Sequence, residues 1–147
     1  MLSKELIYQI VQELDCGLEC YVNLTTQEII SIPNQRQFGG DIDAEEGFEE
    51  QFKQIERQEK DLLHIEPLES FESFKIMERF AAQVDNAFFK ARLEEILGNR
   101  KPFQNFKYAI DNSDFRQDWF SFKQAEQERI IEHRIQVALK WRSEEEE

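Results

Sequence analysis

The residues whose types and spacing could carry a function are cations set among aromatic rings. Seven of the 25 residues in segment 98–122 (GNRKPFQNFKYAIDNSDFRQDWFSF) are aromatic, and basic side chains recur between them. A lysine or arginine can stack on a neighbouring ring, a cation–π contact of about 0.5–2 kcal/mol. The predicted interaction surface consists of five cations around Trp119: Arg100, Lys101, Lys107, Arg116 and Lys123. This surface is a candidate only, and the sequence favours structural roles, because Lys107 and Arg116 could each stack on a neighbouring ring and Arg116 could pair with a carboxylate.

Histidine and cysteine chemistry is sparsely represented. His64 and His133 are the only histidines, and the sequence has no glycine-rich phosphate loop, HExxH or GxSxG pattern. His64 shares a face with Glu66 if this segment is a strand, where a structural hydrogen-bonding role is commoner than metal binding. Cys16 and Cys20 stand four residues apart, which is neither a CxxC pair nor a disulfide framework, and we expect buried or inert thiols.

An acidic run at residues 41–46 resembles the start of an EF-hand loop but fails the template. Position 6 is Glu46 where glycine is needed, and position 12 is Phe52 where a bidentate glutamate belongs. We therefore predict no catalytic residue, no cofactor-binding residue and no metal ligand. Carboxylates are abundant enough that an enzyme using them as general acid and base stays an alternative.

Charge is distributed unevenly along a chain whose net charge is −13. Residues 1–74 carry 17 acidic and 5 basic side chains, whereas residues 75–143 carry 10 acidic and 13 basic ones. The acidic half argues against general affinity for nucleic acid or anionic membranes. No apolar run approaches the roughly 18 residues of a membrane span, and the chain does not start like a signal peptide. These features predict a cytoplasmic protein with no membrane partner.

The elements that must position these residues predict an α+β fold with a small antiparallel sheet of two or three strands and five to six helices. Ser3 can cap a first helix, and residues 19–33 alternate as a β-hairpin with its turn at 25–27. A four- or five-residue loop is expected there, because Gln27 stands where a tight turn favours glycine. Residues 62–66 are the candidate for a short third strand beside the hairpin.

Helical spacing dominates the remainder of the chain. One polar helix covers roughly residues 46–60, and four more begin at Ser70, at Asp85 or Asn86, at Pro102 and after Ser113, the last running from 114 to about 142. Four aromatic residues at helical spacing are expected in the core: Phe103, Phe106, Trp119 and Phe122. We predict one α+β domain over residues 1–143, followed by a disordered acidic tail at 144–147.

A pattern in the second half resembles a known family. Its parts are M-E-x-F at residues 77–80, the leucines and glycine at 93, 97 and 98, F-x-x-F-K at 103–107 and R-x-x-W-x-x-F at 116–122. This is similar to the uncharacterised bacterial protein family numbered 0158 in the UPF series. The likeness covers mainly residues 62–122 and more weakly 18–33. It implies a shared fold, and it implies no activity, substrate or cofactor.

Three classes of function are compatible with these observations. The sequence favours a non-enzymatic protein-interaction or regulatory module that binds an unknown protein partner. A homodimer in which the acidic half of one protomer meets the basic half of the other is also open. The alternatives are a nucleic-acid-associated protein using the basic, aromatic C-terminal half and an enzyme of unknown chemistry.

Overall fold

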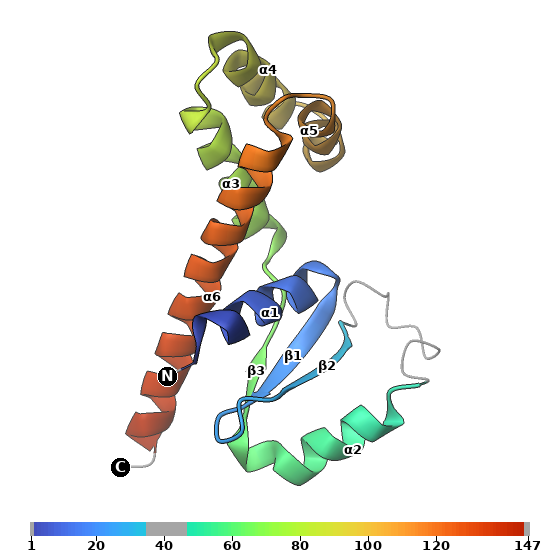
Figure 1. Ribbon diagram of the computed structural model, residues 1–147, viewed down its shortest axis with the longest axis vertical. Helices are drawn as coiled ribbons and strands as arrows, with labels where there is room; N and C mark the ends of the chain where they lie inside the picture. Colours follow the sequence, from blue (N-terminus) through green and yellow to red (C-terminus); the bar gives the residue numbers. More distant parts are fainter. Residues whose placement is uncertain (1, 35–46, 146–147) are drawn as a thin grey trace. The chain divides into compact units, whose positions relative to one another are not determined.

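The structure is a computed structural model that describes residues 2–34 and 47–145 (Figure 1). It confirms the α+β class, with a three-stranded antiparallel sheet. The acidic run tested above as an EF-hand lies outside the described residues. The described elements are α1 (Lys4–Asp15), β1 (Leu18–Asn23), β2 (Ile29–Pro33), α2 (Glu49–Gln58), a 3-10 turn (Glu59–Asp61), β3 (Leu62–Ile65), α3 (Ser70–Gln83), α4 (Ala87–Leu97), α5 (Pro102–Asp111) and α6 (Arg116–Glu145).

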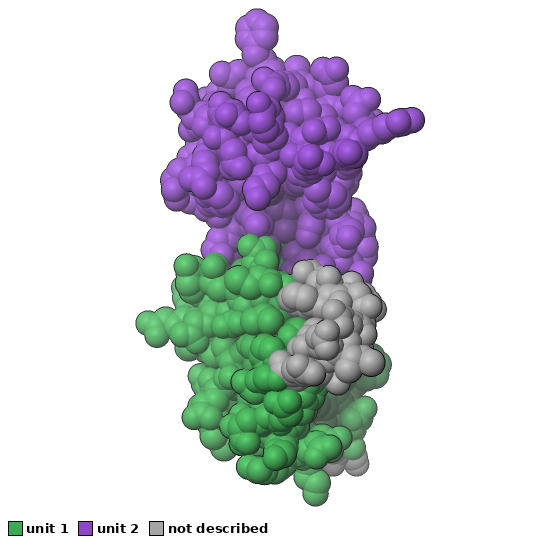
Figure 2. All heavy atoms as spheres, turned by 90° about the vertical axis from the view of Figure 1, so that its right-hand side faces the viewer, with its two compact units in different colours: residues 1–67, 128–147 green, residues 68–127 purple. Residues whose placement is uncertain are grey.

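Two compact units divide these elements (Figure 2). Unit 1 comprises residues 1–67 and 128–147, and unit 2 comprises residues 68–127, so α6 contributes to both. The assignment of one domain over residues 1–143 stays a prediction. Of the predicted tail, residues 144 and 145 belong to α6, and residues 146 and 147 are not described. No described helix is both long enough and apolar enough to span a membrane.

The sheet of unit 1 has the strand order β2-β1-β3, with both neighbours antiparallel to β1. Alternation along β1 separates its two faces. Cys20 and Val22 are fully buried and lie on the face that α1 covers, whereas Glu19 and Tyr21 lie on the opposite face. The apolar stripe of α1 completes this core with Leu6, Ile7, Ile10, Val11 and Leu14, all buried. Ser3 caps the helix as predicted, because its hydroxyl accepts from the Leu6 N–H at 3.1 Å.

Five residues connect β1 to β2, as the missing glycine suggested. The Asn23 side-chain oxygen accepts from the N–H groups of Thr25 and Thr26, both at 2.9 Å, which folds the start of the loop. The Asn23 carbonyl accepts from the Gln27 N–H at 2.7 Å. Gln27 itself adopts a φ of +62°, in the left-handed region that disfavours a residue with a Cβ atom.

Replacing Gln27 by glycine is expected to stabilise the protein by about 0.5–1 kcal/mol. The left-handed backbone costs a non-glycine residue roughly 1–2 kcal/mol, which glycine avoids. The greater conformational freedom of glycine in the unfolded chain offsets part of this stabilisation. Urea unfolding measures the difference. Gln9→Gly, at an exposed position within α1, is the control and should instead lose about 1 kcal/mol. A Gln27→Gly variant less stable than the wild type would contradict the strain argument.

β3 is an edge strand whose outer carbonyls are bound by α6. The Leu24 N–H donates to the Asp61 carbonyl at 2.9 Å. Asp61 and every second residue after it therefore direct their backbone N–H and C=O groups towards β1. The residues between them therefore direct their backbone groups away from β1. Arg142 donates to the carbonyl of Leu62, and Arg134 donates to that of Glu66 at 2.9 Å. The two arginines cover an edge that would otherwise be open to pairing with another chain.

An aromatic core holds unit 2 together. Trp119 and Phe106 are buried, as predicted, and their rings meet edge to face at 4.9 Å. Phe80 contacts Trp119 at 5.3 Å and Phe122 at 5.5 Å. The prediction that Phe103 belongs to the core is wrong: 45% of it is exposed. It lies in the first turn of α5 and makes an edge contact with the half-buried Phe74 at 6.3 Å.

Helix starts in unit 2 follow the predicted signals with two differences. The cap of α3 is Glu69 rather than Ser70, because Glu69 and Glu72 form a reciprocal capping box. The last helix begins at Arg116 rather than 114, because the Ser113 hydroxyl accepts from the Phe115 N–H at 3.1 Å in a turn before it. Asn86 caps α4, and Pro102 opens α5 as predicted.

Candidate functional site

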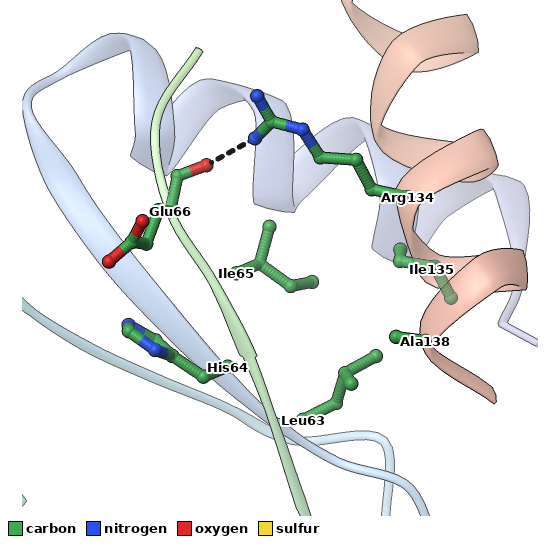
Figure 3. Close-up of a pocket in the computed structure, with 7 residues that line it drawn as sticks. All are labelled: Leu63, His64, Ile65, Glu66, Arg134, Ile135 and Ala138. Atoms are coloured by element: carbon green, nitrogen blue, oxygen red, sulfur yellow. Dashed lines mark hydrogen bonds between the residues drawn. The ribbon is translucent and has the colours of Figure 1, made fainter. Parts of the chain in front are cut away.

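Neighbouring strands bring four side chains together on one face of the sheet. In the β1–β3 register Tyr21 lies opposite His64. Residues two apart in a strand share a face, so Glu19 and Glu66 extend the same row by one position each. We call Glu19, Tyr21, His64 and Glu66 the sheet-face cluster. The prediction that His64 and Glu66 share a face is confirmed, and their side chains point to the same side of β3 (Figure 3).

Glu19 is the centre of the contacts within the sheet-face cluster. Its Oε1 lies 3.3 Å from His64 Nε2 and accepts from the Tyr21 hydroxyl at 3.4 Å. Its Oε2 accepts from the side-chain amide of Asn34, a buried residue, at 3.0 Å. The Tyr21 ring stacks on the imidazole with 4.3 Å between centroids and 7° between planes. These contacts fix the orientation of both Glu19 and His64.

The electrostatic field of the sheet-face cluster is negative. Burial raises the pKa of Tyr21, and the charge of Glu19, its hydrogen bond to the hydroxyl and the charge of Glu66 raise it further. A phenolate is disfavoured here because it would add a third negative charge beside two carboxylates. The same field would attract a cation.

An open pocket of about 440 Å³ lies between β3 and α6 in unit 1 (Figure 3). The side chains of Leu63 and Ile65 point towards α6, and those of His64 and Glu66 point away from it. The pocket therefore has a mixed lining, in which apolar residues of β3 and α6 alternate with the polar residues His64, Glu66 and Arg134. It is lined by Leu63, His64, Ile65, Glu66, Arg134, Ile135 and Ala138.

The five predicted interaction residues all lie in unit 2. Arg100 and Lys101 are exposed in the turn before α5, Lys107 is exposed on α5, Arg116 is exposed at the start of α6, and Lys123 is half-buried. Both alternatives weighed for Arg116 are present together. Its guanidinium carbon lies 4.9 Å from the centroid of the Phe120 ring, and its Nε lies 3.3 Å from Asp111 Oδ1.

Helical spacing and the Arg116–Asp111 ion pair connect aromatic and charged side chains into one strip. Phe103, Lys107 and Asp111 recur every four residues on α5, and Arg116 and Phe120 do so on α6. We call these five residues the α5–α6 strip. Its two rings remain accessible, with exposed fractions of 45% for Phe103 and 39% for Phe120.

Comparison with known proteins identifies relatives but no activity. The model of the family described as "Uncharacterised protein family (UPF0158)" matches residues 3–146. A similar protein is the UPF0158 protein PA5073 of Pseudomonas aeruginosa, which is 31% identical over 70 residues. That alignment spans 47% of this chain and 46% of the relative, so the chain matches about half of that protein's length. No solved structure matches the chain.

Proposed function

The chain belongs to the uncharacterised protein family UPF0158, and we propose that it is a non-enzymatic, cytoplasmic protein-interaction module whose α5–α6 strip binds an acidic, partly apolar segment of another protein. One observation carries the proposal. Phe120 lies under the Arg116 guanidinium but stays exposed, so a ring and a cation are presented together to a ligand.

The chemistry of the strip defines the partner segment. Phe103 and Phe120 offer apolar area that a protein contact would remove from water, and aromatic and arginine side chains are enriched among the residues that dominate binding energy. Lys107 and Arg116 would meet carboxylates of the partner. A segment with acidic residues on either side of an aromatic or aliphatic anchor fits both features.

Charge balance favours a protein over a nucleic acid as the partner. Residues 68–127 carry nine basic and ten acidic side chains, so unit 2 lacks the excess of cations that supplies most of the affinity for a phosphate backbone. Single-stranded nucleic acid is nevertheless a chemical alternative, because its bases stack on exposed rings beside cations.

Removing the two cations is expected to weaken binding of acidic peptides at least about tenfold, the equivalent of 1.4 kcal/mol. A displayed peptide library supplies the ligands, and titration of the enriched peptides against wild type and the Lys107→Gln/Arg116→Gln variant measures the loss. Lys75→Gln/Lys90→Gln is the matched control, because it removes the same charge from exposed positions of unit 2 outside the strip. The control should bind like the wild type.

Two further measurements separate the alternatives. If the wild type binds oligonucleotides with micromolar, salt-sensitive affinity and the strip variant does not, the partner is a nucleic acid and not a protein. Salt-sensitive dimerisation in sedimentation velocity, abolished by the strip variant, would identify a second copy of the chain as the source of the acidic segment. Equal peptide binding by the strip variant and its control would refute a role for the strip.

A further inference from the structure

We propose that the sheet-face cluster is a binding site for a divalent transition-metal ion, with Glu19, His64 and Glu66 as its ligands. The site lies in unit 1 and uses no residue of the α5–α6 strip, so this proposal does not depend on the proposed function.

The positions of the ligand atoms fit a metal centre. One carboxylate oxygen from each glutamate and one imidazole nitrogen all lie within 4.8 Å of one another. Metal–ligand distances of about 2.0–2.2 Å in a tetrahedral site place neighbouring ligand atoms about 3.3–3.6 Å apart. The 3.3 Å between Glu19 Oε1 and His64 Nε2 already has this spacing. Glu66 is exposed, so its carboxylate can close the remaining distance by a change of rotamer.

Neighbouring residues orient Glu19 and His64, as outer hydrogen bonds and packing orient the ligands of a metal site. The buried Asn34 amide donates to Glu19 Oε2 at 3.0 Å, which leaves Oε1 directed at the imidazole. The stacked Tyr21 ring fixes the plane of His64, and its hydroxyl donates to the same carboxylate. Such outer contacts orient ligands and change metal affinity by about 10–100-fold when removed.

Ligand type and charge select the class of ion. Two carboxylates and a neutral imidazole carry two negative charges, which one divalent cation neutralises. An imidazole nitrogen favours Zn²⁺ and its transition-metal neighbours, whereas Ca²⁺ and Mg²⁺ prefer sites made of oxygen atoms. Three protein ligands leave a fourth coordination position for water or an external ligand. The competing explanation is a simple hydrogen bond between Glu19 and His64, which needs no ion and shows no preference for Zn²⁺.

Isothermal titration of the metal-free 147-residue chain, produced without a histidine tag, tests the proposal with ZnCl₂. The exposed Cys16 thiol could bind zinc by itself, so all variants carry Cys16→Ser. One Zn²⁺ per chain is expected to bind at micromolar free concentration, with CaCl₂ and MgCl₂ much weaker. His64→Ala should lower the affinity at least about tenfold. His133→Ala removes the other, exposed histidine and should leave the affinity unchanged.

Imidazole resonances give a second, residue-specific measurement. The chain has two histidines, so the variants assign both, and Zn²⁺ should shift only the signals of His64. If His64→Ala misfolds by circular dichroism, Glu66→Gln decides, because Glu66 is exposed and follows the last residue of β3. No binding at micromolar zinc, or unchanged binding in both cluster variants, would overturn the proposal. Equal affinity for Ca²⁺ and Zn²⁺ would mean that the cluster attracts cations only through its negative charge, and would also overturn the proposal.

Discussion

Trp119→Ala is expected to lower the free energy of unfolding by about 3–5 kcal/mol, the usual cost of truncating a buried aromatic side chain. Only 9% of Trp119 is exposed, and its ring contacts both Phe80 and Phe106 edge to face, at 5.3 and 4.9 Å. Truncation leaves a cavity between these rings and removes two aromatic contacts worth about 0.5–1.5 kcal/mol each beyond the buried area. Folded domains have only about 5–15 kcal/mol in total, so the melting temperature should fall sharply.

The chain supplies its own control for this measurement. Trp141 is the other tryptophan and 62% of it is exposed, so Trp141→Ala should change stability by no more than about 0.5 kcal/mol. Urea unfolding followed by circular dichroism compares both variants with the wild type. Amide hydrogen exchange then locates the loss, which should be greatest within residues 68–127. If Trp119→Ala unfolds like Trp141→Ala, the aromatic core does not hold unit 2 together.

Local sequence signals predicted the elements of the fold because their physical causes are local. Ser3 and Asn86 each satisfy a backbone N–H within three residues, and Pro102 opens α5 because its missing N–H is not needed there. The sequence predictions were wrong where the spacing of apolar residues along a helix was used to predict which side chains are buried. Phe103 has the helical spacing of a core residue, but it lies in the first turn of α5 and is 45% exposed. Periodicity identifies a face of a helix and does not show how far its neighbour extends.

The sheet-face cluster shows what the sequence could not provide. Alternation placed His64 and Glu66 on one face, but Glu19 and Tyr21 stand more than 40 residues earlier. Only the pairing of β1 with β3 brings Tyr21 opposite His64, and a shift of one residue would have turned one strand's side chains to the other face. Register is a property of the assembled sheet, so no single segment contains it. The α5–α6 strip was nearer to prediction, because its two cations were identified, but their connection through Asp111 and the exposure of its two rings were missing.

Alkaline pH is expected to destabilise the protein through Cys20. The pKa of its thiol is raised from 9.0 to about 12. Burial is the largest cause, the contact with the Ser31 hydroxyl opposes it, and the negative charges of Glu13 and Glu19 add to it. In the unfolded chain the thiol ionises at its ordinary pKa. Between these two values the unfolded state binds fewer protons than the folded state, so stability falls as pH rises. The contribution is fully present below pH 9 and is lost progressively up to about pH 12.

A comparison with Cys20→Ala separates the effect of Cys20 ionisation on stability from the effects of the lysines and tyrosines that titrate in the same pH range. The alanine variant loses buried volume, at a cost of roughly 1 kcal/mol at neutral pH, but has no thiol to ionise. Relative to the variant, the wild type should lose about 1 kcal/mol by pH 10 and about 3 kcal/mol by pH 11, so the order of stability should reverse by pH 11. Cys16→Ser changes an exposed thiol and should follow the wild type at every pH. Urea unfolding under reducing conditions at pH 7 to 11 gives the three curves. The contrary result is a wild type that remains more stable than Cys20→Ala by the same free energy of unfolding at every pH up to 11. It would mean that the folded protein tolerates the Cys20 thiolate, and the burial argument would fail.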